Sequence, residues 1–130
     1  MATVPASVKT RANSSGSKDV IVTWTGITNV NLDGQWVSIP GVVVRSIGYS
    51  GVWGAAPVLN MRASNGDAMQ EKATDVVITG AQADEVTLSG PFAANGLTGN
   101  LYQAAGAYRP LFSGGDVTTN LTVTLYGIQD

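Results

Sequence analysis

The residue types that most often carry catalysis are scarce in this chain. Its 130 residues include no His and no Cys, which excludes Ser-His-Asp and Cys-His catalysis and removes the commonest metal ligands. Lys9 and Lys18 lie in an expected N-terminal arm and Lys72 in an expected hairpin, so no serine–lysine active site is expected. We therefore predict a protein that is not an enzyme and that holds no cofactor or metal.

The carboxylates offer two weaker alternatives. Asp84 and Glu85 are adjacent, and on a strand their side chains would point to opposite faces, so they do not form the convergent pair of a glycosidase. Asn65, Asp67 and Glu71 carry oxygen ligands, but their spacing departs from the calcium loop of an EF-hand. The Asn-Gly-Asp run that begins this group is what a hairpin turn requires. We expect a turn there rather than a metal site.

The three tryptophans could stack on sugar rings or fill a core. Trp24 and Trp36 fall on strand positions, where we expect them to be buried. Trp53 is flanked by glycines in the segment 49–54, which we expect to be an exposed or contact-making loop that also presents Tyr49. A carbohydrate-binding β-sandwich module is the alternative that this loop leaves open.

The clearest structural pattern is near the C-terminal end. Residues 120–126 alternate strictly between apolar and polar side chains, which predicts a half-buried β-strand that closes the fold. The same alternation on earlier segments completes a predicted core, which we list as Val20, Val22, Leu59, Met61, Leu121, Val123 and Leu125.

Further short runs of this kind predict about nine or ten strands and no helix. They cover residues 20–24, 35–39, 42–47, 57–63, 68–72, 75–78, 85–88, 100–103, 108–112 and 120–126. Asp33-Gly34 predicts a hairpin turn between the first two strands. Arg45 is a single charge on an apolar strand, which is typical of a sheet edge or of an ion pair. The spacing predicts an all-β fold, a single-domain antiparallel β-sandwich of jelly-roll type.

Composition agrees with this fold class. Charged residues make up only 12% of the chain and 16 residues are Gly, a balance typical of a single β domain with many turns. The formal net charge of −2 gives no general attraction for nucleic acid. The longest apolar run, 39–44, is too short to cross a membrane, and we expect no export signal. We therefore expect no nucleic-acid and no membrane partner.

The N-terminal segment differs from the rest. Residues 1–18 are poor in large apolar side chains and carry three cations and no acid, so we predict a flexible arm that precedes a β-sandwich domain over residues 19–130. The cations are Lys9, Arg11 and Lys18. They suit either a solvated terminus or an arm that lies across a negatively charged neighbour. With Tyr49 and Trp53, they are the predicted partner-binding residues.

Several short motifs between residues 20 and 126 resemble a known family. They are Trp24-Thr25-Gly26, the apolar strand near Val42, Met61-Arg62-Ala63 with the turn Ser64-Asn65-Gly66-Asp67, and Tyr108-Arg109-Pro110 with the block from Gly114 to Leu125. Together they resemble small virion proteins of tailed bacteriophages. The closest point is the C-terminal block, where similar phage proteins carry a Tyr and Arg-Pro before a Gly-Gly-Asp-x-Thr-Thr turn and a Leu-Thr-Val-Thr-Leu strand. Such proteins have a Ser-Asn-Asp-Gly turn where this chain has Asn-Gly-Asp.

The resemblance implies a structural role on the capsid. The expected function is that of a decoration or cement protein, which binds the major capsid protein and stabilises the shell. The chain would be made in the cytoplasm of the bacterial host, would reside on the virion surface, and would form a homotrimer, with a dimer as the alternative. A tail or neck structural protein of the phage would share every one of these sequence features.

Overall fold

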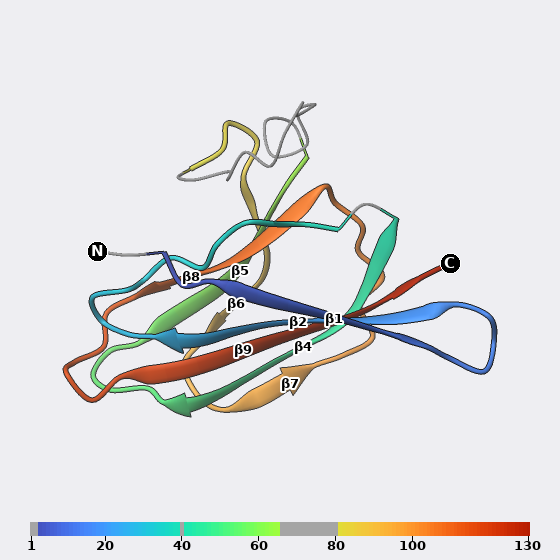
Figure 1. Cartoon of the computed structure of the whole chain (residues 1–130). Coiled ribbons are helices and arrows are strands. Elements are labelled where there is room, and N and C mark those ends of the chain that lie inside the picture. Colours follow the sequence, from blue (N-terminus) through green and yellow to red (C-terminus); the bar gives the residue numbers. More distant parts are fainter. Residues whose placement is uncertain (1–2, 40, 66–80) are drawn as a thin grey trace.

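Every regular element in the described part of the chain is a β-strand. The computed structural model describes residues 3–39, 41–65 and 81–130 (Figure 1). Its strands are β1 (Ala6–Ala12), β2 (Lys18–Ile27), β3 (Val37–Ser38), β4 (Val42–Val52), β5 (Val58–Ser64), β6 (Val86–Phe92), β7 (Gly96–Thr98), β8 (Ala107–Ser113) and β9 (Asn120–Gln129). The predicted all-β class is confirmed.

The strands form two antiparallel sheets that pack face to face. One sheet has five strands in the order β1-β2-β9-β4-β7, and the other has four in the order β3-β8-β5-β6. From β2 onward the chain changes sheet at every connection except that between β5 and β6, which are neighbours. This is the connectivity of a jelly roll. The prediction of a single-domain antiparallel β-sandwich of jelly-roll type is confirmed.

The core lies between the sheets and is built by alternation along the strands. The predicted closing strand is β9, which pairs with β2 on one side and with β4 on the other, so its inward side chains meet neighbours from both. All seven predicted core residues are at most 2% exposed. Trp24 is also fully buried, whereas Trp36 is buried in a small separate cluster with Ala107.

The predicted N-terminal arm is wrong in the part that the structure describes. Residues 6–12 form β1, which pairs with β2 from Ala6–Trp24 to Ala12–Lys18. Asn13 shapes the turn between them, because its side-chain oxygen accepts hydrogen bonds from the backbone N–H groups of Ser15 at 3.0 Å and Ser17 at 3.2 Å. The segment buries few side chains, but pairing its backbone with β2 compensates for the entropy lost on ordering.

Val4 joins the two sheets at the side where β1 and β3 are the outer strands. Its N–H donates to the Asp33 carbonyl oxygen at 2.8 Å, and its own carbonyl accepts from the Gln35 N–H at 2.8 Å. The Val4 side chain is 3% exposed and belongs to the main core. Gly34 also donates to the Pro110 carbonyl at 2.8 Å, so Asp33-Gly34 is not the predicted hairpin turn but part of this junction.

Some predicted boundaries also differ from the structure. β4 runs on to Val52, so Tyr49 lies on a strand and not in a loop. The predicted loop at 90–99 holds the end of β6 and all of β7, and residues 100–103 make only a single bridge, between Gln103 and Val44. The strands predicted at 68–72 and 75–78 lie outside the described residues.

Candidate interaction surfaces

The five predicted partner-binding residues do not form one surface. Lys9 and Arg11 pair across β1 and β2 with Ile21 and Asp19, on the side of the five-stranded sheet that faces away from the core. Lys18 has the opposite orientation, because its neighbour across the hairpin is Ala12 and side chains alternate along a strand. Lys9 and Arg11 therefore share a surface that excludes Lys18.

Tyr49 and Trp53 lie at the other end of this sheet. Tyr49 on β4 faces Val123 on β9, whereas Lys18 faces Gln129 on the same strand. The two positions are six residues apart on β9, about 20 Å along the strand. No single small partner surface spans both groups.

Asp19 organises the basic side chains near the β1–β2 turn. Its carboxylate accepts from Arg11 at 2.9 Å, from the Asn13 amide at 3.2 Å and from the Tyr126 hydroxyl at 3.1 Å. The hydrogen bonds from Arg11 and Asn13 hold the pKa of Asp19 below its ordinary value. Arg11 is thus already paired, although its side chain remains 75% exposed.

Arg45 is a further basic residue on the same side, which the sequence-based list of contact residues missed. A bulge in β4 between Val44 and Ser46 contains it. Its guanidinium lies 4.3 Å from the centre of the Tyr102 ring and donates to the Tyr102 hydroxyl at 2.9 Å. The isolated charge on an apolar strand was the available signal. Of the two expectations for Arg45, the sheet edge is wrong because β4 lies between β9 and β7. In the described residues an aromatic ring that is 71% exposed stands in place of the acid partner.

The Tyr49–Trp53 segment closes the side of the sandwich between β4 and β6. The Tyr49 ring stacks on Phe92 of β6 with 3.9 Å between ring centres, and Trp53 meets Tyr49 edge-on at 6.3 Å. The Trp53 indole N–H donates to the Asn95 side-chain oxygen at 2.8 Å. Both predicted contact residues are half-buried and pack against the core. This contradicts the exposed loop, whereas the contact-making alternative stays a prediction.

Apolar side chains are exposed at the same end of the molecule. The loops 28–32, 53–57 and 114–119 meet there, at the left of Figure 1, and the Thr119 hydroxyl donates to the Trp53 carbonyl at 2.9 Å. Four valines of these loops and the adjoining strands are 39–92% exposed. We call this surface the valine end; it consists of Val30, Val52, Val58 and Val117.

A buried ion-pair network occupies the outward side of the four-stranded sheet. Arg109 on β8 and Arg62 on β5 are directly paired across the strands, and both donate to Glu85. Arg109 also lies 4.9 Å from the centre of the Trp36 ring. Burial raises the pKa of Glu85, but the hydrogen bonds from Arg109 and Arg62 outweigh it and hold that pKa below its ordinary value. The network joins two strands to the residues that precede β6.

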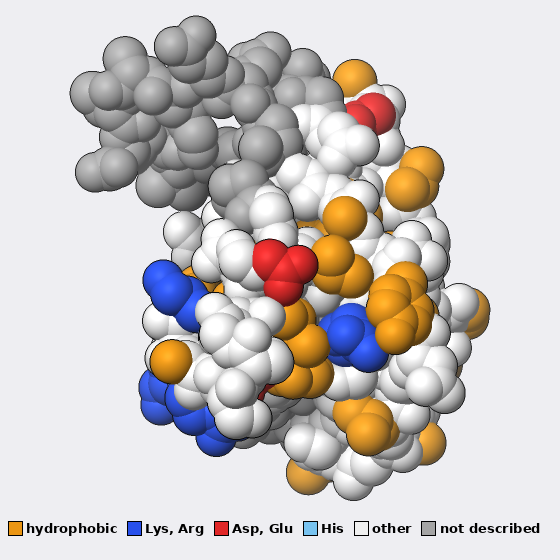
Figure 2. All heavy atoms as spheres, turned by 90° about the vertical axis from the view of Figure 1, so that its right-hand side faces the viewer, with side chains coloured by type: hydrophobic (Ala, Val, Ile, Leu, Met, Phe, Trp, Pro, Cys, Tyr) orange, Lys and Arg blue, Asp and Glu red, His pale blue; other side chains and the backbone are white. Residues whose placement is uncertain are grey.

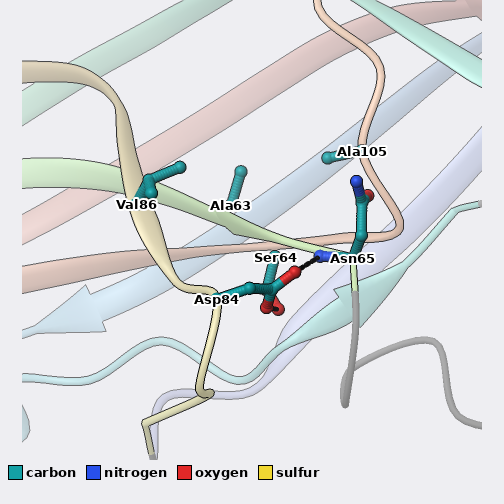
Figure 3. Close-up of a pocket in the computed structure, with 6 residues that line it drawn as sticks. All are labelled: Ala63, Ser64, Asn65, Asp84, Val86 and Ala105. Carbon is teal, nitrogen blue, oxygen red and sulfur yellow. Dashed lines mark hydrogen bonds between the residues drawn. The ribbon is translucent and has the colours of Figure 1, made fainter.

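One small open cavity lies at the end of β5 (Figure 3). Its volume is about 80 Å³ and its lining residues are Ala63, Ser64, Asn65, Asp84, Val86 and Ala105. Asp84 accepts from the Asn65 N–H at 2.8 Å and from the Ser64 hydroxyl, as Figure 3 shows for Asn65. Ligand pockets for small molecules measure about 300–1,000 Å³, so this cavity is of solvent size. Asp84 and Glu85 bind different partners and do not converge.

The described residues contain no group of three or more His, Cys, Asp or Glu that could hold a metal ion. Asp67 and Glu71 of the rejected calcium loop lie outside the described residues. No helix in the described ranges is long and apolar enough to cross a membrane. Comparison with protein-family models, with curated proteins and with solved structures finds no match to this chain.

Proposed function

We propose that this chain is a structural virion protein of a tailed bacteriophage, which decorates the capsid surface and stabilises the shell by binding the major capsid protein. The observation that carries the proposal is the valine end, where Val117 is 92% and Val30 62% exposed. Exposed apolar side chains gathered at one end of a small domain are typical of protein-binding surfaces. The resemblance of the C-terminal block to virion proteins points to the shell as the setting.

We also propose that the chain forms a homotrimer, with a dimer as the alternative. Copies that meet through the valine end would remove these four side chains from water, which favours association in proportion to the apolar area that is covered. A trimer fits a local three-fold axis of a shell. The chain would be made in the host cytoplasm and then assembled onto the capsid.

The fold supports this role only by analogy. Jelly rolls occur both in viral capsid proteins and in lectins, so the fold suits the carbohydrate-binding alternative equally well. Trp53 weighs against that alternative, because its indole N–H is used by Asn95 and its ring is half-buried in a T-shaped contact with Tyr49. A sugar-binding platform needs a free aromatic face.

The direct experiment is cosedimentation of the purified chain with shells assembled from the major capsid protein alone. We expect saturable binding and an increased thermal stability of the shells. A labelled chain on intact particles should appear on the capsid surface. Failure to bind these shells, or a label confined to the tail or neck, would contradict the decoration role.

The oligomer is tested separately by solution mass at micromolar concentration. Val30→Ser with Val117→Ser should shift the trimer towards monomer, whereas Val8→Ser, at a valine that is 49% exposed on β1, is the matched control and should not. A monomeric wild-type chain, both in solution and on the particle, would refute self-association. If the wild-type chain binds glycans and Trp53→Phe does not, the carbohydrate-binding alternative would be favoured instead.

A further inference from the structure

The side of the five-stranded sheet that faces away from the core carries several basic side chains. The strands β1, β2, β9 and β4 present there a row in which Lys9, Ile21, Tyr126 and Ser46 are neighbours. Ile21 and Tyr126 are half-buried. Because these side chains point away from the core, they belong to a surface and not to the packing between the sheets.

Basic side chains border this row on both sides. Lys9 and Arg11 lie on β1 at one margin, and Arg45 lies on β4, three strands away, at about 14 Å. The strand order β1-β2-β9-β4 places Tyr126 on β9 between Arg11 on β1 and Arg45 in the bulge of β4. We call Lys9, Arg11, Tyr126, Arg45 and Tyr102 the basic face.

The described part of the chain does not neutralise the basic face. Asp19 is the acid that contacts it, and Asp19 is already paired with Arg11. Lys9 and Arg45 form no ion pair with an acid in the described part of the chain. Figure 2 looks onto the end of the molecule with the β1–β2 turn and shows Lys and Arg side chains at separate points, with hydrophobic side chains and an acidic side chain among them. A chain with net charge −2 therefore presents a locally positive surface.

We infer that the basic face is the surface through which this protein binds an acidic protein partner, and, given the proposed function, that this partner is an acidic surface of the shell subunit. Arg and Tyr are the residues that protein interfaces favour. Their charge would steer the encounter with a negatively charged surface. A second copy of this chain does not fit the basic face, since face-to-face contact would bring Lys9, Arg11 and Arg45 against the same cations.

A protein fits this face better than nucleic acid does. A DNA-binding protein can make about 6–10 phosphate contacts, whereas in the described residues this surface offers two cations without an acid partner and one that is already paired with Asp19. The half-buried Ile21 and Tyr126 between the cations would contact apolar groups of a protein, which a phosphate backbone does not supply.

The test is cosedimentation of variants with shells assembled from the major capsid protein alone, at low and high salt. Lys9→Glu combined with Arg45→Glu should weaken binding about tenfold or more at 50 mM salt, and this difference should shrink at 500 mM, because exposed charges are screened. Thr23→Glu places an acid on the same side of β2 without removing the Arg45–Tyr102 contact, and should weaken binding in the same direction. Circular dichroism and Tm would verify that each variant is folded.

Lys18→Glu is the control, since it makes the charge reversal of Lys9→Glu on the opposite side of the hairpin. We expect its binding to stay within about twofold of wild type. Equal weakening by Lys18→Glu, or wild-type binding by both folded variants of the basic face, would overturn the inference while leaving the decoration role intact. Binding of wild type to a 30-base-pair DNA duplex, with loss of shell binding after nuclease treatment, would overturn it in favour of nucleic acid. No binding of wild type to shells would refute the proposed function itself.

Discussion

Arg109 and Glu85 form a bidentate ion pair in which each side chain is only 5% exposed. One terminal nitrogen of Arg109 lies 2.9 and 3.0 Å from the two carboxylate oxygens of Glu85, and its Nε donates at 3.3 Å. Arg62 donates to the same carboxylate at 2.9 Å. Two guanidinium groups that would otherwise repel each other across β5 and β8 therefore share Glu85 as a common acid.

Glu85→Gln should destabilise the fold strongly. The change removes the acid that Arg62 contacts and leaves Arg109 with the more exposed Asp33, and breaking a buried pair costs about 3–5 kcal/mol of unfolding free energy. Asp33→Asn is the control, because this acid is 39% exposed and 3.6 Å from the same guanidinium, so its removal should cost less than about 1 kcal/mol. Urea denaturation measures both. Equal effects would show that the network does not depend on Glu85.

The same pair makes stability fall in acid. The pKa of Glu85 in the folded state lies below its ordinary value, so the unfolded chain binds the proton more tightly. Its contribution is complete above the unfolded pKa, about 4.3, and is lost as the pH falls through the lower folded pKa. Between pH 6 and pH 3, wild type should therefore lose more unfolding free energy than Glu85→Gln. Parallel pH profiles for the two proteins would contradict this prediction.

Val4 should contribute to stability although it lies in the segment predicted to be an arm. Val4→Ala removes two methyl groups from a site that is 3% exposed and should cost about 1–3 kcal/mol. Val8→Ala is the same substitution at a side chain that is 49% exposed, and should cost less than about 0.5 kcal/mol. Chemical denaturation of both variants decides the matter. A stable Val4→Ala protein would restore the view that the N-terminal segment is dispensable.

The closing strand offers a test of the alternation on which the fold prediction was based. Leu121→Ala should cost about 2–5 kcal/mol, because Leu121 is fully buried and its truncation leaves a cavity. Thr122→Ala, on the outward side of the same strand, should stay within about 0.5 kcal/mol of wild type. Similar denaturation midpoints for the two variants would mean that β9 does not present its apolar face to the core.

The fold was predictable because buried and exposed side chains alternate along a β-strand. Leu121, Val123 and Leu125 stand on one side of β9, and Leu59 and Met61 on one side of β5, so alternation alone identifies the core. A strand that pairs through its backbone and buries few side chains does not show this alternation in its sequence. Residues 6–12 are ordered mainly by backbone hydrogen bonds to β2, and composition alone therefore suggested a flexible arm.

The contact residues were harder to predict, because they depend on neighbours far apart in the sequence. Arg45 meets Tyr102, and Tyr49 stacks on Phe92; neither pairing can be read from a local pattern. Glycines around Trp53 suggested a free loop, but the ring also packs against Tyr49. Lys9 and Lys18 looked equivalent in sequence, and only the strand register separates their sides.

Gly34 marks the point where local sequence reasoning and the tertiary structure conflict, and it provides a final prediction. Asp33-Gly34 resembles a hairpin turn, yet Gly34 is required because a β-carbon there would overlap the Pro110 ring and touch Trp24. Gly34→Ala must therefore displace Pro110 on β8 or break the Val4 junction, and should cost about 3 kcal/mol or more. At Gly48 a β-carbon would meet Leu97 at an ordinary 3.6 Å, so Gly48→Ala should change stability by less than about 1 kcal/mol. Thermal denaturation of both variants tests this contrast, and a Gly34→Ala protein as stable as Gly48→Ala would show that the junction is not closely packed.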